Sequence, residues 1–138
     1  MKRFIFVFAI ILLTASLASA QQNEAPQKEA AAKEAVLAVV GESVHDFGTI
    51  KEADGPVTHT FTVKNEGEIP LIITNATASC GCTKPEYTKE PIAPGKTGEV
   101  KVTYNPSGNI PFNKTISVFS NGKVGSYILT IKGVVEGR

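Results

Sequence analysis

The chain has 138 residues, of which 42% are hydrophobic, with 14 basic and 13 acidic side chains and a formal net charge of +1. This length corresponds to a single domain. The near-zero charge, with lysines that stand singly among acidic residues, argues against a protein that tracks nucleic acid with a basic patch and against one that binds anionic lipid by charge alone.

The first twenty residues have the pattern of a cleavable signal peptide. Lys2 and Arg3 precede an apolar run over residues 4–13, which is too short to span a bilayer, and a small-x-small cleavage motif ends at Ala20. We expect cleavage between Ala20 and Gln21, which removes two of the 14 basic residues and leaves 12 against 13 acidic ones, a net charge of −1. The mature protein is predicted to be exported to the periplasm or the cell exterior, without a transmembrane segment.

Residues 21–40 differ in composition from the sequence that follows. They are rich in alanine, glutamate and lysine, which form helices readily but have little to bury, and Glu29 stands four residues before Lys33, a pairing that supports an isolated helix. A helix of this length is marginal in water because nucleation is costly. We therefore predict a flexible, partly helical spacer over residues 21–40, ahead of a folded domain over residues 41–138.

From Glu42 onward the sequence consists of short β-type runs separated by glycine, proline and asparagine. Alternating apolar and polar residues mark half-buried strands, and Asn121-Gly122 is a strong hairpin signal between the last two runs. Six strands are predicted, over Val44–Phe47, Val57–Lys64, Leu71–Ala78, Val100–Tyr104, Phe112–Ser120 and Tyr127–Val135, with a seventh near Tyr87–Ile92. This pattern indicates an all-β domain, a single immunoglobulin-like β-sandwich of about seven strands.

Details of these strands lead to further expectations. The chain has no tryptophan and no widely spaced cysteine pair, so it lacks the inter-sheet disulfide of antibody domains. His59 shares the apolar face of its strand and is interpreted as a core residue, and Asp46 is interpreted as the cap of a turn. The strands over Val44–Ile50 and Phe112–Ser120 are predicted to be sheet edges that could add a partner's strand.

Several segments of this domain resemble a known family. They are Asp46-Phe47-Gly48-Thr49-Ile50, the run from His59 to Gly67, Leu71-Ile72-Ile73, Ser79-Cys80-Gly81-Cys82-Thr83-Lys84-Pro85, the run from Ile92 to Lys96 and the run from Val102 to Pro106. Together they resemble the bacterial family catalogued as domain of unknown function 1573. The resemblance implies an exported protein, common in Bacteroidetes-type bacteria, with a sandwich similar to those of the Hydin and major-sperm-protein type and no settled activity. His45 departs from the expected aromatic or aliphatic residue.

The two cysteines carry the candidate site with chemical content. Its residues are the redox or metal candidates Cys80 and Cys82 and the supporting loop residues Ser79, Gly81, Thr83 and Pro85. A positive φ at the glycine would let a small, strained disulfide ring close, which would act as an oxidant or a labile switch. Two free thiolates would instead suit Cu(I), or Zn(II) if nitrogen or oxygen ligands complete the four positions. In a third interpretation the cysteines only pack at the end of the sandwich and close a turn.

The leading hypothesis is a non-catalytic binding or structural module of the bacterial envelope, which contacts a protein or an envelope polymer through loops or an edge strand. The alternative is thiol–disulfide redox chemistry or copper binding through the Cys-Gly-Cys loop. The sequence contains no phosphate-binding loop, nucleophile elbow or metalloprotease helix, so an enzyme is not favoured. No cofactor is predicted apart from the copper or zinc considered for the two cysteines.

Overall fold

The computed structural model describes residues 33–137, and within this range the chain forms eight β-strands and one short 3-10 helix. The strands are β1 (Leu37–Val40), β2 (Val44–Lys51), β3 (Val57–Asn65), β4 (Ile73–Ala78), β5 (Thr83–Tyr87), β6 (Thr97–Tyr104), β7 (Pro111–Ser120) and β8 (Ser126–Glu136), and the helix is η1 (Glu52–Asp54). None of the described residues forms a helix long and apolar enough to cross a membrane. The predicted leader, its cleavage site at Ala20 and Gln21, and residues 21–32 of the predicted spacer lie outside the described residues.

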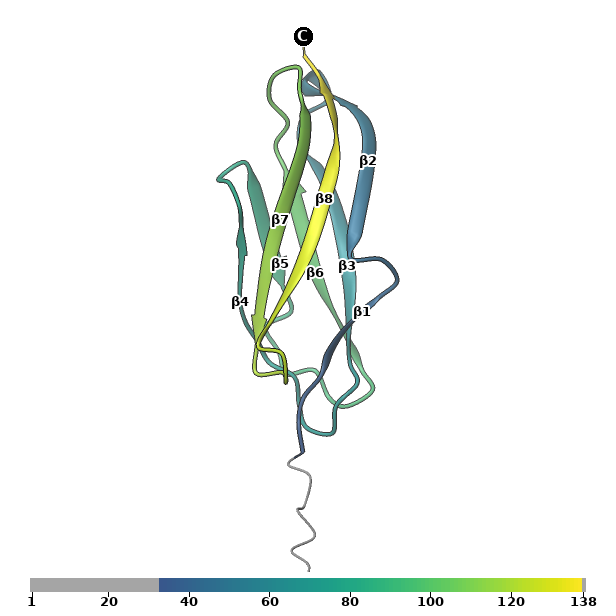
Figure 1. Ribbon diagram of the computed structural model, residues 1–138, viewed down its shortest axis with the longest axis vertical. Helices are drawn as coiled ribbons and strands as arrows, with labels where there is room; N and C mark the ends of the chain where they lie inside the picture. Colours follow the sequence, from purple (N-terminus) through teal and green to yellow (C-terminus); the bar gives the residue numbers. More distant parts are fainter. Residues whose placement is uncertain (1–32, 138) are drawn as a thin grey trace, which may run out of the picture. The chain divides into compact units, whose positions relative to one another are not determined.

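The strands form two four-stranded sheets that pack face to face (Figure 1). One sheet has the order β1-β3-β6-β5 and the other has the order β2-β8-β7-β4. Neighbouring strands are antiparallel except for β2 and β8, which run parallel. The predicted all-β sandwich is therefore confirmed, and so is the predicted hairpin between the last two strands, because β7 and β8 are antiparallel neighbours. The connecting loop covers residues 121–125, and its positive φ lies at Gly125 and not at the Asn121-Gly122 pair.

Two strands differ from the sequence prediction. β1 lies inside the segment predicted to be a spacer, because Leu37 and Val39 face the core and pair with buried residues of β3. The seventh predicted strand, Tyr87–Ile92, is wrong in position, since the strand is β5 (Thr83–Tyr87). Pro85 argues against a strand in the sequence pattern. Proline is tolerated in β5, however, because this strand lies at the edge of its sheet.

One of the two predicted edges is also wrong. The strand over Phe112–Ser120 is internal, because β7 lies between β8 and β4. The prediction for Val44–Ile50 is confirmed, since β2 has β8 as its single neighbour in the sheet. The pairing of β4 with β7 joins segments about forty residues apart in the chain, as in Ala76↔Val118. Local sequence patterns do not report such pairings.

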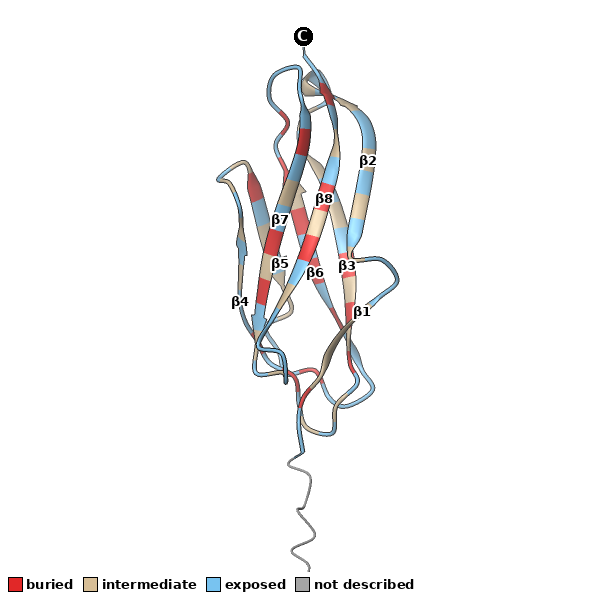
Figure 2. Cartoon of the chain, viewed as in Figure 1, coloured by how far each residue is buried: buried red, intermediate tan, exposed pale blue. Residues whose placement is uncertain are grey.

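The core lies between the inner faces of the two sheets (Figure 2). Buried and exposed residues alternate along β6, which places Val100 and Val102 inside, as their period-two pattern predicts. The largest fully buried apolar side chains are Leu71, Ile116, Leu129, Ile131, Val63, Val100, Val102, Val118 and Val135. Each side chain of this kind stabilises the fold by about 1.5–3 kcal/mol relative to an exposed position.

Asn65, the last residue of β3, is a polar side chain with no exposed surface in this apolar core. Its Nδ2 donates to the carbonyl oxygens of Ile69 at 2.7 Å and Ile92 at 2.9 Å. Its Oδ1 accepts from the backbone N–H groups of Gly67 at 2.9 Å and Val36 at 3.3 Å. One amide therefore ties together the segment leading into β1, the turn after β3 and the segment that precedes β6.

The turn after β3 closes directly against the backbone that leads into β1. A Cβ atom at Gly67 would lie 2.6 Å from the backbone nitrogen of Val36 and 2.7 Å from Cα of Ala35, so a side chain there would displace that backbone. The β7–β8 loop also contacts this backbone, because the N–H of Lys123 in that loop donates to the carbonyl oxygen of Ala35 at 2.9 Å. The start of β1 is thus held by the turn after β3 and by the β7–β8 loop.

Replacement of Asn65 tests the importance of this amide. Asn65→Ala removes four hydrogen bonds and leaves buried backbone groups unpaired, so we expect the free energy of unfolding in urea to fall by about 2–4 kcal/mol. The matched control is Asn75→Ala, since Asn75 is exposed and its Oδ1 accepts from the neighbouring Ala76 N–H. The control should change stability by less than about 0.5 kcal/mol. Equal losses in the two variants would contradict the role given to Asn65.

Candidate functional site

Each sheet leaves two strand edges without a neighbouring strand within residues 33–137, and three of these four edges are interrupted. Pro85 lacks an N–H at a position of β5 that faces away from β6. β2 has a register shift between Asp46 and Thr49, and β4 has a similar shift. Prolines and bulges of this kind prevent an edge from pairing with another chain. β1 (Leu37–Val40) contains neither, so its edge is open to pairing.

The hydrogen-bond register shows which backbone groups of β1 are free. The N–H of Glu66 donates to the carbonyl oxygen of Val36 at 2.9 Å, and this bond sets the phase of the antiparallel ladder. Alternate residues of such a ladder bond to the neighbouring strand. Ala38 and Val40 therefore bond to β3, whereas Leu37 and Val39 direct their N–H and C=O groups away from it. These four groups have the two-residue spacing that an added strand requires.

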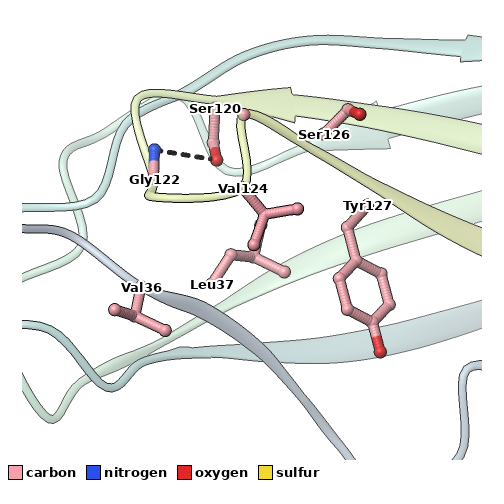
Figure 3. A pocket seen from close by; sticks show the side chains of 8 residues that line it. Val36, Leu37, Ser120, Gly122, Val124, Ser126 and Tyr127 are labelled. Atoms are coloured by element: carbon pink, nitrogen blue, oxygen red, sulfur yellow. Dashed lines mark hydrogen bonds between the residues drawn. The ribbon is translucent and has the colours of Figure 1, made fainter.

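A small apolar pocket lies beside this edge, between the start of β1 and the β7–β8 loop (Figure 3). Val36 and Leu37 line one side, and Val124 and Tyr127 line the other. Val124 is 77% exposed, the highest value among the large apolar side chains of residues 33–137. The loop that presents it is fixed by a hydrogen bond from the Gly122 N–H to Ser120 Oγ at 3.2 Å. Its volume is about 10 Å³, which is the size of about one water molecule, so it is a small apolar depression beside the edge and not a site for a whole side chain.

The Cys-Gly-Cys loop connects β4 to β5 and so crosses from one sheet to the other. Cys80 and Cys82 form a disulfide, with their Cα atoms 5.3 Å apart. The expectation of a positive φ at Gly81 is wrong, because the glycines with positive φ in the described chain lie elsewhere. The loop is instead closed by a backbone hydrogen bond from the Thr83 N–H to the Cys80 carbonyl oxygen at 3.3 Å.

Thr83 is the buried residue of this loop, with 4% of its surface exposed. Its hydroxyl oxygen lies 3.7 Å from the sulfur of Cys80 and 3.8 Å from that of Cys82, within the longer hydrogen-bond range of sulfur. A surface pocket with a volume of about 260 Å³ adjoins the loop. Its lining consists of Pro56, Gly81, Cys82, Lys84, Thr103 and Asn105.

The other two predicted loop residues, Ser79 and Pro85, take part in strand pairing and are not hydrogen-bonded to the sulfurs. Ser79 extends the β4–β7 pairing, since its N–H donates to the Thr115 carbonyl oxygen at 3.0 Å and its Oγ accepts from the Thr115 N–H at 3.3 Å. Pro85 lies in the middle of β5, opposite Val102. The structure thus brings together Cys80, Cys82 and Thr83 from the predicted set.

The two histidines lie together between the sheets. The rings of His45 on β2 and His59 on β3 stack with centroids 3.6 Å apart and an interplanar angle of 7°. Phe47 and Phe61 pack edge-on against this pair. His59 lies on the inner face of β3, but it is half-buried and not one of the buried residues, so its interpretation as a core residue holds only in part. Asp46 is confirmed as a turn cap, since its Oδ1 accepts from the Gly48 N–H at 2.8 Å.

Stacked rings of this kind do not direct two nitrogens at one ion, and residues 33–137 contain no cluster of three or more His, Cys, Asp or Glu side chains placed to hold a metal. In the disulfide form neither sulfur is a thiolate, so reduction of Cys80 and Cys82 must precede any binding of Cu(I) or Zn(II) there. Burial lowers the pKa of His59, and the charge of His45 acts in the same direction.

The edge of β1 and its pocket are absent from the sequence prediction. The signal for β1 is the short apolar run from Leu37 to Val40 before Gly41, which is β-branched in its second half. The pocket has no such signal, because the β7–β8 loop and the start of β1 are more than eighty residues apart in the chain, as in the hydrogen bond from Lys123 to Ala35.

The fold is similar to solved structures of other proteins. A protein of unknown function from Porphyromonas gingivalis W83 has a TM-score of 0.64 and 17% identity, over 74% of this chain and 47% of that one. The ASH/PapD-like domain 7 of human CEP192 has a TM-score of 0.57 and 8% identity, over 76% and 87%. The VesB protease of Vibrio cholerae has a TM-score of 0.56 and 19% identity, over 71% and 31%. The chain thus spans less than half of the Porphyromonas and Vibrio proteins, and the likeness is one of fold.

A family model described as a protein of unknown function (DUF1573) matches residues 38–135. This range begins within β1 and contains the Cys-Gly-Cys loop. No curated protein sequence matches the chain.

The histidine pair makes stability depend on pH. Because the folded-state pKa of His59 is lowered, the unfolded state binds more protons below about pH 6.5, and stability falls as the pH drops through that value. We expect the urea midpoint to decrease between about pH 7.5 and about pH 5, and we expect His59→Phe to flatten that decrease. Glu66→Gln, at an exposed site away from the pair, is the control and should retain it. A wild-type slope in His59→Phe would contradict this assignment.

Proposed function

We propose that this chain, which belongs to the DUF1573 family of proteins of unknown function, is a non-catalytic module that binds an extended segment of a partner protein along the edge of β1. The observation that carries the proposal is the edge itself: within residues 33–137, β1 leaves backbone groups unpaired and has neither the proline nor the register shift found at the other three edges. The immunoglobulin-like fold is consistent with such a role, because sandwiches of this class offer edges and loops to partners.

The binding mode follows from the geometry of the edge. A partner strand would exchange hydrogen bonds with the N–H and C=O groups of Leu37 and Val39, each worth about 0.5–1.5 kcal/mol net. Apolar side chains of the partner would cover the exposed side chains of Val40 and Val124 beside the edge. Main-chain pairing supplies affinity in this mode, and the apolar side-chain contacts supply selectivity.

We also propose that the domain acts outside the cytoplasm, in the periplasm or beyond the cell. The leader pattern of residues 1–20 supports this location. The disulfide between Cys80 and Cys82 is also suited to an oxidising compartment. The partner would then be a protein of the bacterial envelope.

Val39→Pro tests the edge, because it removes an N–H that points away from β3 and leaves the β1–β3 ladder intact. With a photo-crosslinking residue at position 40 in the native bacterium, we expect the wild-type protein to form discrete partner adducts and Val39→Pro to lose at least about nine-tenths of them. Because Val39 packs against the core, some stability is also lost, but less than in a variant that breaks the ladder. Ala38→Pro is the matched control. It removes an N–H that bonds to β3, so it should lower stability as well as binding.

Two outcomes would contradict the proposal. Val39→Pro could retain the wild-type adducts, which would show that partner contact does not use the edge. Alternatively, Val39→Pro could lose as much stability as Ala38→Pro or more, which would show that the N–H of Val39 is not free in the folded protein.

A second candidate function is thiol–disulfide exchange, or soft-metal binding after reduction, at Cys80 and Cys82. The observation that favours it is the buried Thr83 hydroxyl within reach of both sulfurs, since a hydrogen-bond donor at sulfur stabilises a thiolate. The Cys-Gly-Cys ring spans few residues, so it constrains the unfolded chain little.

A double variant, Cys80→Ser with Cys82→Ser, separates this candidate from a structural role. We expect the variant to unfold within about 1 kcal/mol of the wild-type protein, because the closed loop is short. We also expect the producing bacterium to become more sensitive to thiol oxidants or copper. Wild-type resistance to both stresses in the double variant would remove the second candidate.

A further inference from the structure

The surroundings of the Cys-Gly-Cys disulfide are not symmetric. Cys82 lines the surface pocket beside the loop, and Cys80 does not. Lys84, in β5, lines the same pocket as Cys82, which lies in the turn just before that strand. One sulfur-bearing residue is therefore presented to a pocket that also contains an ammonium group.

The pocket is suited to an anionic nucleophile of small size. None of its six lining residues is acidic, and Lys84 supplies a positive charge. Asn105 and Thr103 add polar side chains to the lining. A volume of about 260 Å³ accommodates one or two residues of an extended peptide rather than a large ligand. A cysteine thiolate combines the charge and the size that this lining accepts.

The other sulfur has a group placed to receive charge. When the disulfide breaks by attack at Cys82, the electron pair of the S–S bond remains on Cys80. The Thr83 hydroxyl lies 3.7 Å from that sulfur and 3.8 Å from the sulfur of Cys82, and Thr83 is largely shielded from water. The hydroxyl can therefore donate to whichever sulfur leaves, and the direction of attack is set by the pocket at Cys82. Hydrogen bonds to an ionised acceptor are stronger than those to a neutral one, so this hydroxyl stabilises the departing thiolate.

We propose that cysteine thiolates enter this pocket and attack the sulfur of Cys82, with Cys80 as leaving group, Lys84 attracting the nucleophile and Thr83 positioned at the leaving sulfur. This inference rests on the second candidate function, thiol–disulfide exchange. A thiolate RS⁻ forms an S–S bond to Cys82 and releases the Cys80 thiolate. A second substrate thiolate then attacks the sulfur of R, which forms the substrate disulfide and releases the Cys82 thiolate. The substrate dithiol is oxidised by two electrons and the loop disulfide is reduced.

The test treats the oxidised, purified protein with glutathione and with a short unstructured dithiol peptide. The reaction is stopped with acid and iodoacetamide, and peptide mass mapping locates the mixed disulfide. We expect glutathione on Cys82 and the alkyl group on Cys80. The rate ratio of the two probes distinguishes a small thiol from a polypeptide thiol as the source of the nucleophile.

Variants of Thr83 and Lys84 test the roles proposed for these two residues. We expect Thr83→Val to slow exchange about tenfold, the effect of one hydrogen bond to a charged group, and Thr83→Ser to restore the wild-type rate. We expect Lys84→Gln to slow glutathione about threefold at low salt and less at high salt. Lys64→Gln, which changes an outward-facing lysine of β3 at the far end of the sheet, is the charge-matched control and should retain the wild-type rate.

The outcomes separate this inference from the function on which it rests. Exchange with glutathione attached to Cys80, or equally to both sulfurs, would overturn the assigned direction of attack and leave exchange itself intact. Exchange with the expected direction but unchanged rates in Thr83→Val and Lys84→Gln would overturn the roles of those residues. Failure of both thiol probes to reduce the disulfide would overturn the inference and the second candidate function together.

Discussion

The buried amide of Asn65 is the interaction on which the arrangement of this domain depends. The core around it is otherwise held by apolar packing, which has little directional preference, whereas the four hydrogen bonds of Asn65 specify the positions of three separate segments. One of these segments leads into β1 at Val36. Gly67 permits the same approach, because a side chain at that position would collide with the backbone before β1. The open edge of β1 is therefore presented by contacts deep in the fold and not by the four residues of the strand alone.

The two regions with functional potential lie at opposite edges of one sheet. In the order β1-β3-β6-β5, the free strand β1 stands at one end and β5, which follows the Cys-Gly-Cys loop, stands at the other. β3 and β6 separate them and contribute fully buried residues such as Val63 and Val100 to the core. Pairing at β1 and chemistry at the disulfide therefore use different surfaces on a common rigid support. Loss of one would leave the other in place, so the binding module and the redox role can be examined independently.

The sequence predicts most of this fold where the information is local. Alternation identifies β6 and the inner face of β3, and Asn121-Gly122 identifies the β7–β8 hairpin. The sequence prediction fails where a strand depends on distant segments. β1 follows a helix-forming stretch but forms a strand because it pairs with β3. The strand over Phe112–Ser120 is internal because it pairs with β4. For the candidate site, the spacing of the cysteines leaves a disulfide, a metal site and a packed turn open, and the structure contains the disulfide. The contacts of Thr83 and the stacking of His45 on His59 are not predictable, because they depend on how the two sheets pack.

The most direct measurement of the central claim is amide hydrogen exchange along β1, residue by residue, with and without the envelope partner identified by crosslinking. In the free protein the amides of Ala38 and Val40 should be protected by β3, and those of Leu37 and Val39 should exchange rapidly. Addition of the partner should protect Leu37 and Val39 and leave the amides of β5 unchanged. Rapid exchange of Leu37 and Val39 in the complex, at the rate of the free protein, would contradict the claim that the edge of β1 is the binding site.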